Sequence, residues 1–441
     1  MDIFLSFEIL TKDYAKGVSL FLSTFRKLKL NKMKTWGIKL SLYLNYFVFA
    51  ILLNSVGIVI LKAISLYGVD EVEASVLEAF KDLPIAIVSF FMASFLPRIG
   101  YKKAMLAALA LVSGASVFMY FGDSFFAAKV LFAAVGAAFA LIKVSVYACI
   151  GLVTTSPQEH SGLMSSVEGV FMFGIALAYF LFPAFNLDND PKAWLNVYWF
   201  LAALSVLSFL LLLKADFQEG QEIPGANLKE DFLQMLQLIT KFMVLVFVLS
   251  AFLFVMVEQG IMTWLPTFNK EVLALPENVA IMMASIFAIS LGVGRLLAGY
   301  LSTFFSWFYI VAGCIVATVL MVLFVLPQTV AMGEVSNPIV QLSQVPLLGY
   351  AFPLVGLFIA PIYPLLNSAV LSALPKSLHS PMTGLIIVFS ALGGTLGSRA
   401  MGYLFAGLGP AEGFYYTLIP IGGLFLALIL LHKLTQKQQI L

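Results

Sequence analysis

Apolar runs of about 20 residues recur twelve times along this chain, and they constrain its fold more than any other feature. A helix needs about that length to cross the hydrocarbon core of a bilayer. The 441 residues are 61% hydrophobic and 11% charged, against roughly 25% charged residues in soluble domains. Only helices and closed barrels satisfy their backbone groups in lipid, and the runs lack the alternation of a barrel strand. The sequence therefore predicts an all-α membrane protein.

The twelve runs form two groups of six, separated by one long polar stretch. We expect membrane-spanning helices at residues 38–66, 74–98, 104–122, 124–153, 161–185, 193–214, 242–269, 277–304, 307–326, 343–373, 381–408 and 412–434. The predicted segments are an N-terminal arm (1–37), a six-helix bundle (38–214), a linker (215–241), a second six-helix bundle (242–434) and a tail (435–441). In the linker, Asn227 and Glu230 predict the start of an amphipathic helix that lies on the membrane surface. Two six-helix halves are typical of transporters built from internal repeats.

Basic residues gather on one side of the predicted membrane. They are Arg98, Lys102, Lys103, Lys214, Lys229, Lys241, Lys376, Lys433 and Lys437, together with the basic N-terminal arm. The turns on the other side are mainly acidic, with Asp70, Glu71, Glu73, Asp123, Asp188, Asp190, Glu271, Glu277, Glu334 and Glu412. By the positive-inside rule both termini are cytoplasmic. The arm lacks the apolar run and cleavage site of a signal peptide, and we expect a multi-pass protein of a bacterial inner (plasma) membrane.

Charged and polar residues inside the predicted spans follow a three-helix period. The third, sixth, ninth and twelfth spans carry no interior charge and should form the lipid-facing scaffold. The other spans carry Asn45, Asn54, Glu78, Lys81, Asp82, Lys143, Glu168, Glu258, Gln259, Arg295, Tyr363, Asn367 and Arg399. A charge at bilayer depth must face protein or water. The pattern therefore indicates a polar cavity between the two halves.

Lys143 and Glu168 lie at similar depth on consecutive antiparallel spans, on either side of a short polar turn. A lone lysine in hydrocarbon is costly, so the carboxylate is its natural partner. One interpretation is an ion pair that holds the two helices together. In a second, Lys143 binds a substrate carboxylate or phosphate and releases Glu168. In a third, Glu168 is a proton acceptor whose pairing with Lys143 changes during transport.

Several segments carry recognisable motifs. They are FLPRIGYKKAM (95–105), FVMVEQGIMTWLP (254–266), Gly294 with Arg295 and Gly299, GLFIAPIYPLLNSAV (356–370) and GGTLG (393–397). These segments resemble the major facilitator superfamily, and within it the fucose-galactose-glucose/proton symporter branch. The resemblance implies twelve spanning helices in two six-helix halves, the major facilitator fold. Asn54 is followed by Ser55 where that branch usually has an Asn-Asp pair, and Lys143 stands near a position where it usually has a carboxylate.

The resemblance places Glu258 on a helix that lines the cavity, with a ligand or proton role, and it favours gating or packing for Arg295. Arg399 could face an anionic substrate or pair with a carboxylate. Asp82, near Glu78 and Lys81, is expected at a solvated rim or an extracellular gate. Neutral donors and acceptors suited to a small polar ligand complete the predicted substrate site, and they are Asn54, Gln259, Trp264, Tyr363 and Asn367.

No phosphate-binding glycine loop, metal-ligand cluster or nucleophile and base pattern occurs, so we expect no enzyme activity, no ATP-driven transport and no cofactor. The net charge of +2 is too small to indicate nucleic-acid binding. We expect a monomeric secondary transporter that imports a small polar solute such as a sugar together with protons. The alternatives are a carrier of organic anions, amino acids or short peptides that uses Lys143, and a drug-proton antiporter.

Overall fold

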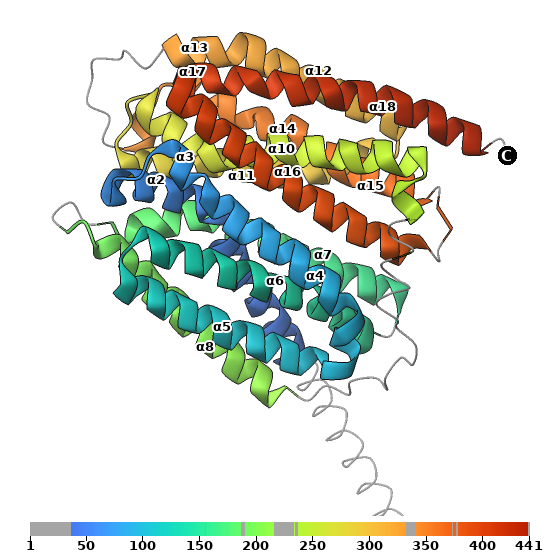
Figure 1. The fold of residues 1–441 in the computed structure, drawn as a ribbon, viewed down its shortest axis with the longest axis horizontal. Coiled ribbons are helices and arrows are strands. Elements are labelled where there is room, and N and C mark those ends of the chain that lie inside the picture. Colours follow the sequence, from blue (N-terminus) through green and yellow to red (C-terminus); the bar gives the residue numbers. More distant parts are fainter. Residues whose placement is uncertain are drawn as a thin grey trace, which may run out of the picture.

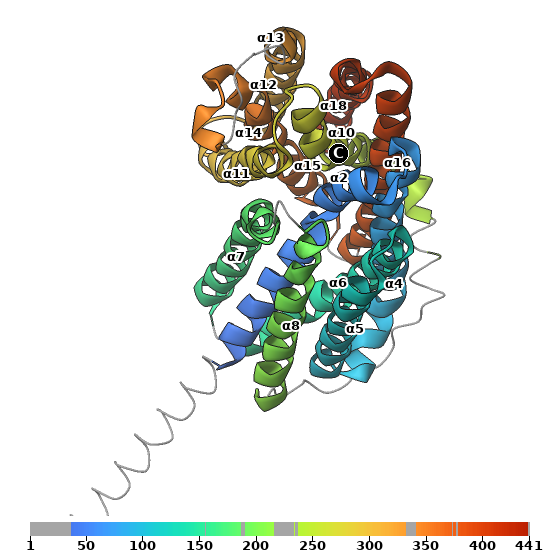
Figure 2. The ribbon, with the colours of Figure 1, turned by 90° about the vertical axis from the view of Figure 1, so that its left-hand side faces the viewer.

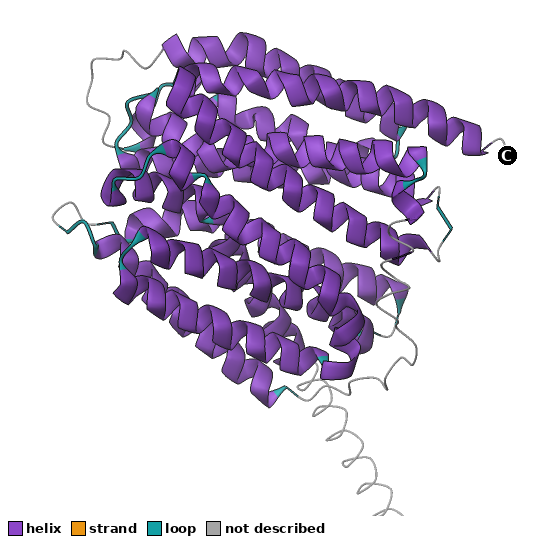
Figure 3. Cartoon of the chain, in the orientation of Figure 1, coloured by secondary structure: helices purple, strands orange, loops and turns teal. Residues whose placement is uncertain are grey.

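The computed structural model describes residues 37–154, 156–186, 190–215, 233, 237–331, 341–372, 374–375 and 378–439. Over these residues the chain is helical and contains no β-strand (Figure 3). Eleven of the described helices are long and apolar enough to cross a membrane. A further helix, α4 (Val76–Ile99), carries the charges of Glu78, Lys81 and Asp82. The prediction of an all-α membrane protein is confirmed. The predicted N-terminal arm and most of the linker with its amphipathic helix lie outside the described residues.

The N-terminal half begins with a span over Gly37–Tyr67, whose second part is α2 (Val56–Tyr67). Its other elements are α3 (Glu71–Ala74), α4, α5 (Tyr101–Gly122), α6 (Phe125–Val153), α7 (Pro157–Ala184), η1 (Ala193–Leu195) and α8 (Asn196–Lys214). Serine side chains cap two of the long helices, because Ser124 accepts a hydrogen bond from the Ala127 amide and Ser156 accepts one from the Glu159 amide. These caps set where α6 and α7 begin (Figure 1).

The C-terminal half contains α10 (Phe242–Glu271), α11 (Glu277–Leu301), α12 (Trp307–Leu320), η2 (Met321–Val325), α13 (Leu326–Ala331), η4 (Leu342–Gln344), η5 (Leu347–Tyr350), η6 (Phe352–Val355), α14 (Gly356–Ile359), α15 (Ile362–Ser372), α16 (His379–Leu408), α17 (Pro410–Gly413), η8 (Phe414–Thr417) and α18 (Leu418–Gln439). The span predicted at 343–373 is broken into short pieces at its prolines, which remove backbone donors. The last helix continues to Gln439 and does not stop at the predicted residue 434.

The two halves lie side by side, with the N-terminal half (blue to green) below the C-terminal half (yellow to red) in Figure 2. They meet where α2 packs on α10, α4 on α16 and α7 on α11. Gly57 of α2 allows one close approach, since a Cβ there would lie 2.4 Å from the Thr263 carbonyl oxygen of α10. We call the end of the molecule that carries α3, the end of α10 and the start of α11 the α3 end; it lies at the left in Figure 1.

Candidate functional site

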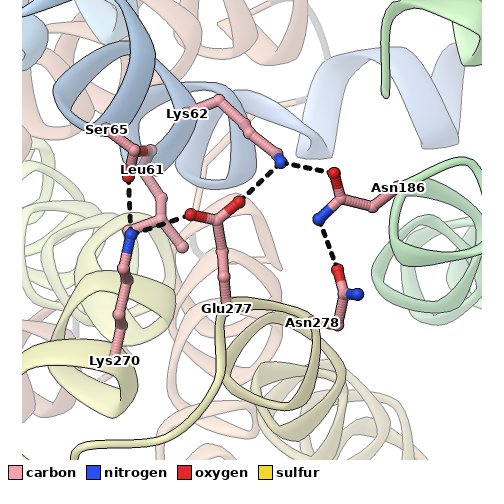
Figure 4. Close-up of polar contacts among 7 residues, drawn as sticks. All are labelled: Leu61, Lys62, Ser65, Asn186, Lys270, Glu277 and Asn278. Atoms are coloured by element: carbon pink, nitrogen blue, oxygen red, sulfur yellow. Dashed lines mark hydrogen bonds and ion pairs between the residues drawn. The ribbon is translucent and has the colours of Figure 1, made fainter. Parts of the chain in front are cut away.

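One carboxylate joins the two halves at the α3 end (Figure 4). Glu277, the first residue of α11, lies 2.5 Å from Nζ of Lys62 in α2 and 2.8 Å from Nζ of Lys270 in α10. The Lys62 side chain is only 4% exposed, so this pair is shielded from water. Lys270 also donates to the Ser65 hydroxyl of α2, at 2.7 Å. We call Lys62, Ser65, Lys270 and Glu277, with Asn186 and Asn278, the bridging network.

The two asparagines extend this network beside Lys62. Lys62 donates to Oδ1 of Asn186 at the end of α7, 3.0 Å away. The Asn186 amide donates to Oδ1 of Asn278 in α11, 2.6 Å away. The bridging network therefore joins the two halves at the α3 end through charged and neutral side chains.

Nearby, within the N-terminal half, a hydrogen bond from Lys192 to Asp123 (2.5 Å) raises the pKa of the lysine.

Arg399 of α16 makes a second connection across the halves. Its Nη1 donates to the Val72 carbonyl oxygen of α3 at 2.9 Å and lies 3.4 Å from the Ser75 hydroxyl. The guanidinium also lies 5.4 Å from the centre of the Tyr403 ring. Of the two expectations for Arg399, an anionic substrate or a carboxylate partner, the second is not met: its partners are a backbone carbonyl and a hydroxyl. Arg399 thus anchors α16 on α3.

Glu78, Lys81 and Asp82 form an acidic cluster between the halves. Their exposed fractions are 0%, 3% and 7%. Of the two expectations for these residues, the solvated rim is therefore wrong, because α16 packs on α4 and Thr263 of α10 contacts Glu78. The extracellular gate stays a prediction. Lys81 is hydrogen-bonded to Glu78, and its Nζ lies 3.6 Å from Oδ1 of Asp82. Thr263 of α10 donates to Oε2 of Glu78 at 3.1 Å. The cluster therefore lies where α4 contacts α10 and α16 of the other half.

Lys143 and Glu168 do not form the predicted ion pair, since each has another neighbour within the N-terminal half. Lys143 is exposed, and its Nζ lies 5.9 Å from the centre of the Phe139 ring. Glu168 accepts a hydrogen bond of 2.5 Å from the Tyr147 hydroxyl. The charged groups that act on Lys143 are Glu168 and, from the other half, Arg295. Lys143 therefore lies within electrostatic reach of charged groups from both halves.

Aromatic side chains surround this lysine and carboxylate on the N-terminal half. The Tyr46 and Phe171 rings meet edge to face at 5.5 Å, and Phe139 lies 5.8 Å from Phe171. Tyr147 lies 6.1 Å from Tyr46. Such a surface offers apolar faces beside a few polar groups, as ligand sites in proteins commonly do.

The C-terminal half presents Glu258 and Arg295. Nη2 of Arg295 lies 3.5 Å from Oε1 of Glu258, and Nη1 lies 3.3 Å from the sulfur of Met172 in α7. The Arg295 side chain is 41% exposed, whereas that of Glu258 is 11% exposed. Because its contact with Glu258 is long and its side chain is partly exposed, the Arg295 guanidinium keeps N–H groups that could donate to a ligand. Since Met172 belongs to the other half, Arg295 reaches across the interface.

Tyr363 and Asn367 of α15 lie beside Glu258. The Tyr363 hydroxyl is 3.1 Å from the Ser390 hydroxyl of α16, and its ring stacks on Phe254 at 5.3 Å. Asn367 is within hydrogen-bonding reach of Tyr363, and its Oδ1 is buried without a hydrogen-bond partner. These neutral groups supply an unused acceptor and two hydroxyls near the carboxylate.

The three other predicted residues have partners of their own. Asn54 donates to the Ala50 carbonyl oxygen one turn earlier, at 2.9 Å. Trp264 is fully buried, and its indole nitrogen donates to the Ser398 carbonyl oxygen at 3.0 Å. Gln259 is half-buried, and its Cγ packs close to Gly394. The structure thus gives Trp264 a place in the packing of α10 against α16, away from solvent.

Sequence reasoning does not select Lys62, the central cation of the bridging network. Lys62 interrupts the apolar run VGIVILKAISLY, which is the same signal that selects Lys143. Glu277 is predicted only as a residue of a turn. The missing information is the pairing of α2 with α10 and α11, which only the packing of the two halves supplies.

The two groups of charges differ in their exposure and in their position along the helices. Lys143 lies 14 residues beyond Lys129, which is near Glu73 of α3, and therefore about 21 Å along α6. Arg295 lies 18 residues after Glu277, about 27 Å along α11. Both are exposed, while the acidic cluster nearer the α3 end is buried. The buried charged groups therefore lie toward the α3 end, and the exposed ones lie further along the helices.

Comparisons with known proteins agree with this architecture. The sequence profile of the Major Facilitator Superfamily matches residues 42–398. No curated protein sequence matches the chain. A bacterial homolog of the human lysosomal transporter Spinster, in an inward-facing and unoccupied conformation, is similar in structure with a TM-score of 0.67 and 13% identity, over 91% of this chain and 98% of that one.

Two further solved structures share the fold. The nucleoside transporter NupG has a TM-score of 0.65 at 14% identity, over 91% of this chain and 98% of that one. A variant of the fucose:proton symporter FucP of E. coli has a TM-score of 0.58 at 14% identity, over 89% of this chain and 98% of that one. At these identities the likeness concerns the fold.

Proposed function

Because the chain belongs to the major facilitator superfamily, and the similar solved structures are transporters, we propose that it imports a small polar solute, such as a sugar, together with protons. The observation that supports this proposal is the contrast between the contacts that join the halves at the α3 end and the exposed Lys143 and Arg295 further along. Two halves joined by contacts that can break at one end suit alternating access.

The distribution of basic residues indicates which end of the molecule faces the outside of the cell. The basic turns lie at the end opposite α3, so the positive-inside rule makes the α3 end extracellular. The conformation is then inward-facing, with the bridging network and Arg399 closing the outer entrance. Import requires these contacts to part so that solute reaches the site from outside, and to form again behind it. A ligand drives such a change only through different affinities for the two conformations.

Two carboxylates at the site are candidates for the proton. Glu258 faces Arg295 of α11, Lys81 of α4 and Tyr363 of α15. Glu168 faces the Tyr147 hydroxyl, with Tyr46 and Lys143 nearby. Protonation of Glu258 would remove the charge that attracts Arg295. Protonation of Glu168 would weaken the hydrogen bond from Tyr147, because a neutral carboxyl group is a weaker acceptor than a carboxylate. Protonation would thereby make the Arg295 guanidinium and the Tyr147 hydroxyl more available to donate hydrogen bonds to the solute.

The side chains near Lys143 and Glu258 support the proposed class of solute. The aromatic faces around Tyr46 and the hydroxyls of Tyr363 and Ser390 suit a sugar, since sugars combine apolar ring faces with hydroxyl groups. A second candidate, an organic anion, amino acid or short peptide, is favoured by one observation. Lys143 is exposed, lacks an ion-pair partner among the described residues, and lies within electrostatic reach of a second cation, Arg295.

Binding of a ligand panel to the purified protein tests both candidates. The panel contains neutral hexoses and pentoses, mono- and dicarboxylates, and dipeptides, each compared with Lys143→Ala and with the control Lys192→Ala. Lys192 is 73% exposed and lies in a turn near the α3 end. We expect sugar binding that Lys143→Ala leaves within a few fold of the unmutated protein. Carboxylate binding that Lys143→Ala abolishes and Lys192→Ala preserves would establish the second candidate in its place.

A further inference from the structure

The acidic cluster of α4 holds more negative charge than its surroundings neutralise. Glu78 and Asp82 share one ammonium group, that of Lys81. With both carboxylates ionised, the cluster carries a net charge of −1 where its residues are at most 7% exposed. An uncompensated buried charge is strongly unfavourable, so such groups take up a proton or acquire a partner. We propose that Asp82 binds a proton and that this proton holds the α3 end closed; the inference rests on the proposed proton-coupled transport.

The geometry distinguishes Asp82 from Glu78. Glu78 has the direct bond from Lys81 and a second donor, the Thr263 hydroxyl, at 3.1 Å. Among the described residues, the contact given for Asp82 is the longer one to Lys81, at 3.6 Å. Its Oδ2 instead faces the α16 backbone, where a Cβ on Gly394 would lie 2.3 Å away. The carboxylate with the weaker compensation is therefore the one that takes the proton.

The elements packed on the cluster bring Asp82 no second cation among the described residues. α6, which packs on α4 at Lys81, carries Lys129, which lies 3.9 Å from Glu73, and Lys143, whose charged neighbours are Glu168 and Arg295. From α10 come Thr263 and Glu258, and Glu258 adds negative charge near Lys81. From α7 comes Tyr179, which lies within electrostatic reach of Glu78. The basic residue of α16, Arg399, is engaged with Val72 and Ser75 of the same half as the cluster. The proton is therefore the remaining source of compensation.

Parting of the halves changes the environment of Asp82. In the closed state α16 covers its carboxylate, and Gly394 makes that contact close. When α16 and α10 move away, water reaches the carboxylate and can stabilise its charge, so the open state releases the proton more readily. The closed state binds the proton more tightly, and by linkage a lower pH favours closure. A proton taken up from outside would then drive the outer entrance shut behind the solute.

The test is a distance measurement without solute or gradient. Spin labels are placed at Phe121→Cys on α5 and Glu412→Cys on α17, both exposed and near the α3 end, with the native Cys149 and Cys314 replaced by alanine. Their separation is recorded by electron–electron double resonance in nanodiscs between about pH 5 and about pH 9, a range in which buried carboxyl groups titrate. We expect the ratio of open to closed molecules to rise with pH, by up to about tenfold per pH unit, the limit for one proton.

Asp82→Asn should keep the molecule closed across the whole pH range. Glu78→Gln should also remove the pH dependence, because it leaves Lys81 and Asp82 as a neutral pair, and it serves as the second variant if Asp82→Asn does not fold. Asp190→Asn, at an exposed position in a turn, should respond to pH like the unmutated protein. A pH response unchanged in both Asp82→Asn and Glu78→Gln would overturn the proposal. Because no solute is used, failure of proton-driven uptake alone would refute the proposed function and leave this result standing.

Discussion

Removing the charge of Lys62 should shift the molecule toward the state that is open at the α3 end. Lys62→Met keeps the unbranched apolar stem of the side chain but removes the contacts to Glu277 (2.5 Å) and Asn186 (3.0 Å). Surface ion pairs contribute about 0–1 kcal/mol, and breaking a buried pair costs about 3–5 kcal/mol. Glu277 is 19% exposed and keeps Lys270, so it is not left unpaired. We therefore expect a loss of about 1–2 kcal/mol, confined to the closed state.

At about 1.4 kcal/mol for each factor of ten, that loss raises the ratio of open to closed molecules by about 5- to 30-fold. Glu277→Gln should act more strongly, because it leaves both Lys62 and Lys270 without their carboxylate. The assay is the same spin-label distance at one pH. A matched control is Lys129→Met, which removes the 3.9 Å contact to Glu73 at the same end but within one half. Equal distance distributions in Lys62→Met, Glu277→Gln and the control would refute the reasoning.

Three further substitutions test the contacts between helices. Gly57→Ala places a Cβ 2.4 Å from the Thr263 carbonyl oxygen in the other half, so we expect the spin-label distance to lengthen while circular dichroism shows the same helix content. Trp264→Phe removes the hydrogen bond to Ser398 and part of a buried ring. It should cost about 1–2 kcal/mol of stability, seen as a lower melting temperature in detergent. Arg399→Gln should open the α3 end as Lys62→Met does, and an unchanged distance would show that its contact with α3 does not contribute.

Hydropathy and proline placement are sufficient to predict most of the fold. The spans predicted at 124–153 and 242–269 agree with α6 (Phe125–Val153) and α10 (Phe242–Glu271) within a few residues, because lipid imposes a minimum helix length. The prolines of the span at 343–373 indicate where that helix breaks. Residues that face another helix follow no such rule, since which helices become neighbours depends on tertiary packing.

The candidate site shows this limit in particular residues. The similar predicted depths of Lys143 and Glu168 suggest that they form a pair, but depth does not specify how each side chain is rotated about its helix axis. In the structure the Tyr147 hydroxyl donates a hydrogen bond to Glu168. A motif selects Trp264, and the structure buries it against Ser398. A position near the end of a span predicts a rim for Asp82, whereas α16 covers it. In each case the partner belongs to a helix distant in sequence or to a face that periodicity does not specify.

Solute uptake into proteoliposomes under an imposed pH gradient tests the central claim most directly. With the outside acidic, the account predicts that a radiolabelled hexose, carboxylate or dipeptide from the binding panel accumulates above its external concentration. Accumulation should disappear with a protonophore, and in Glu258→Gln, while Lys192→Ala retains it. Uptake that reaches only the external concentration, at the same rate with and without the gradient, would contradict proton-coupled transport.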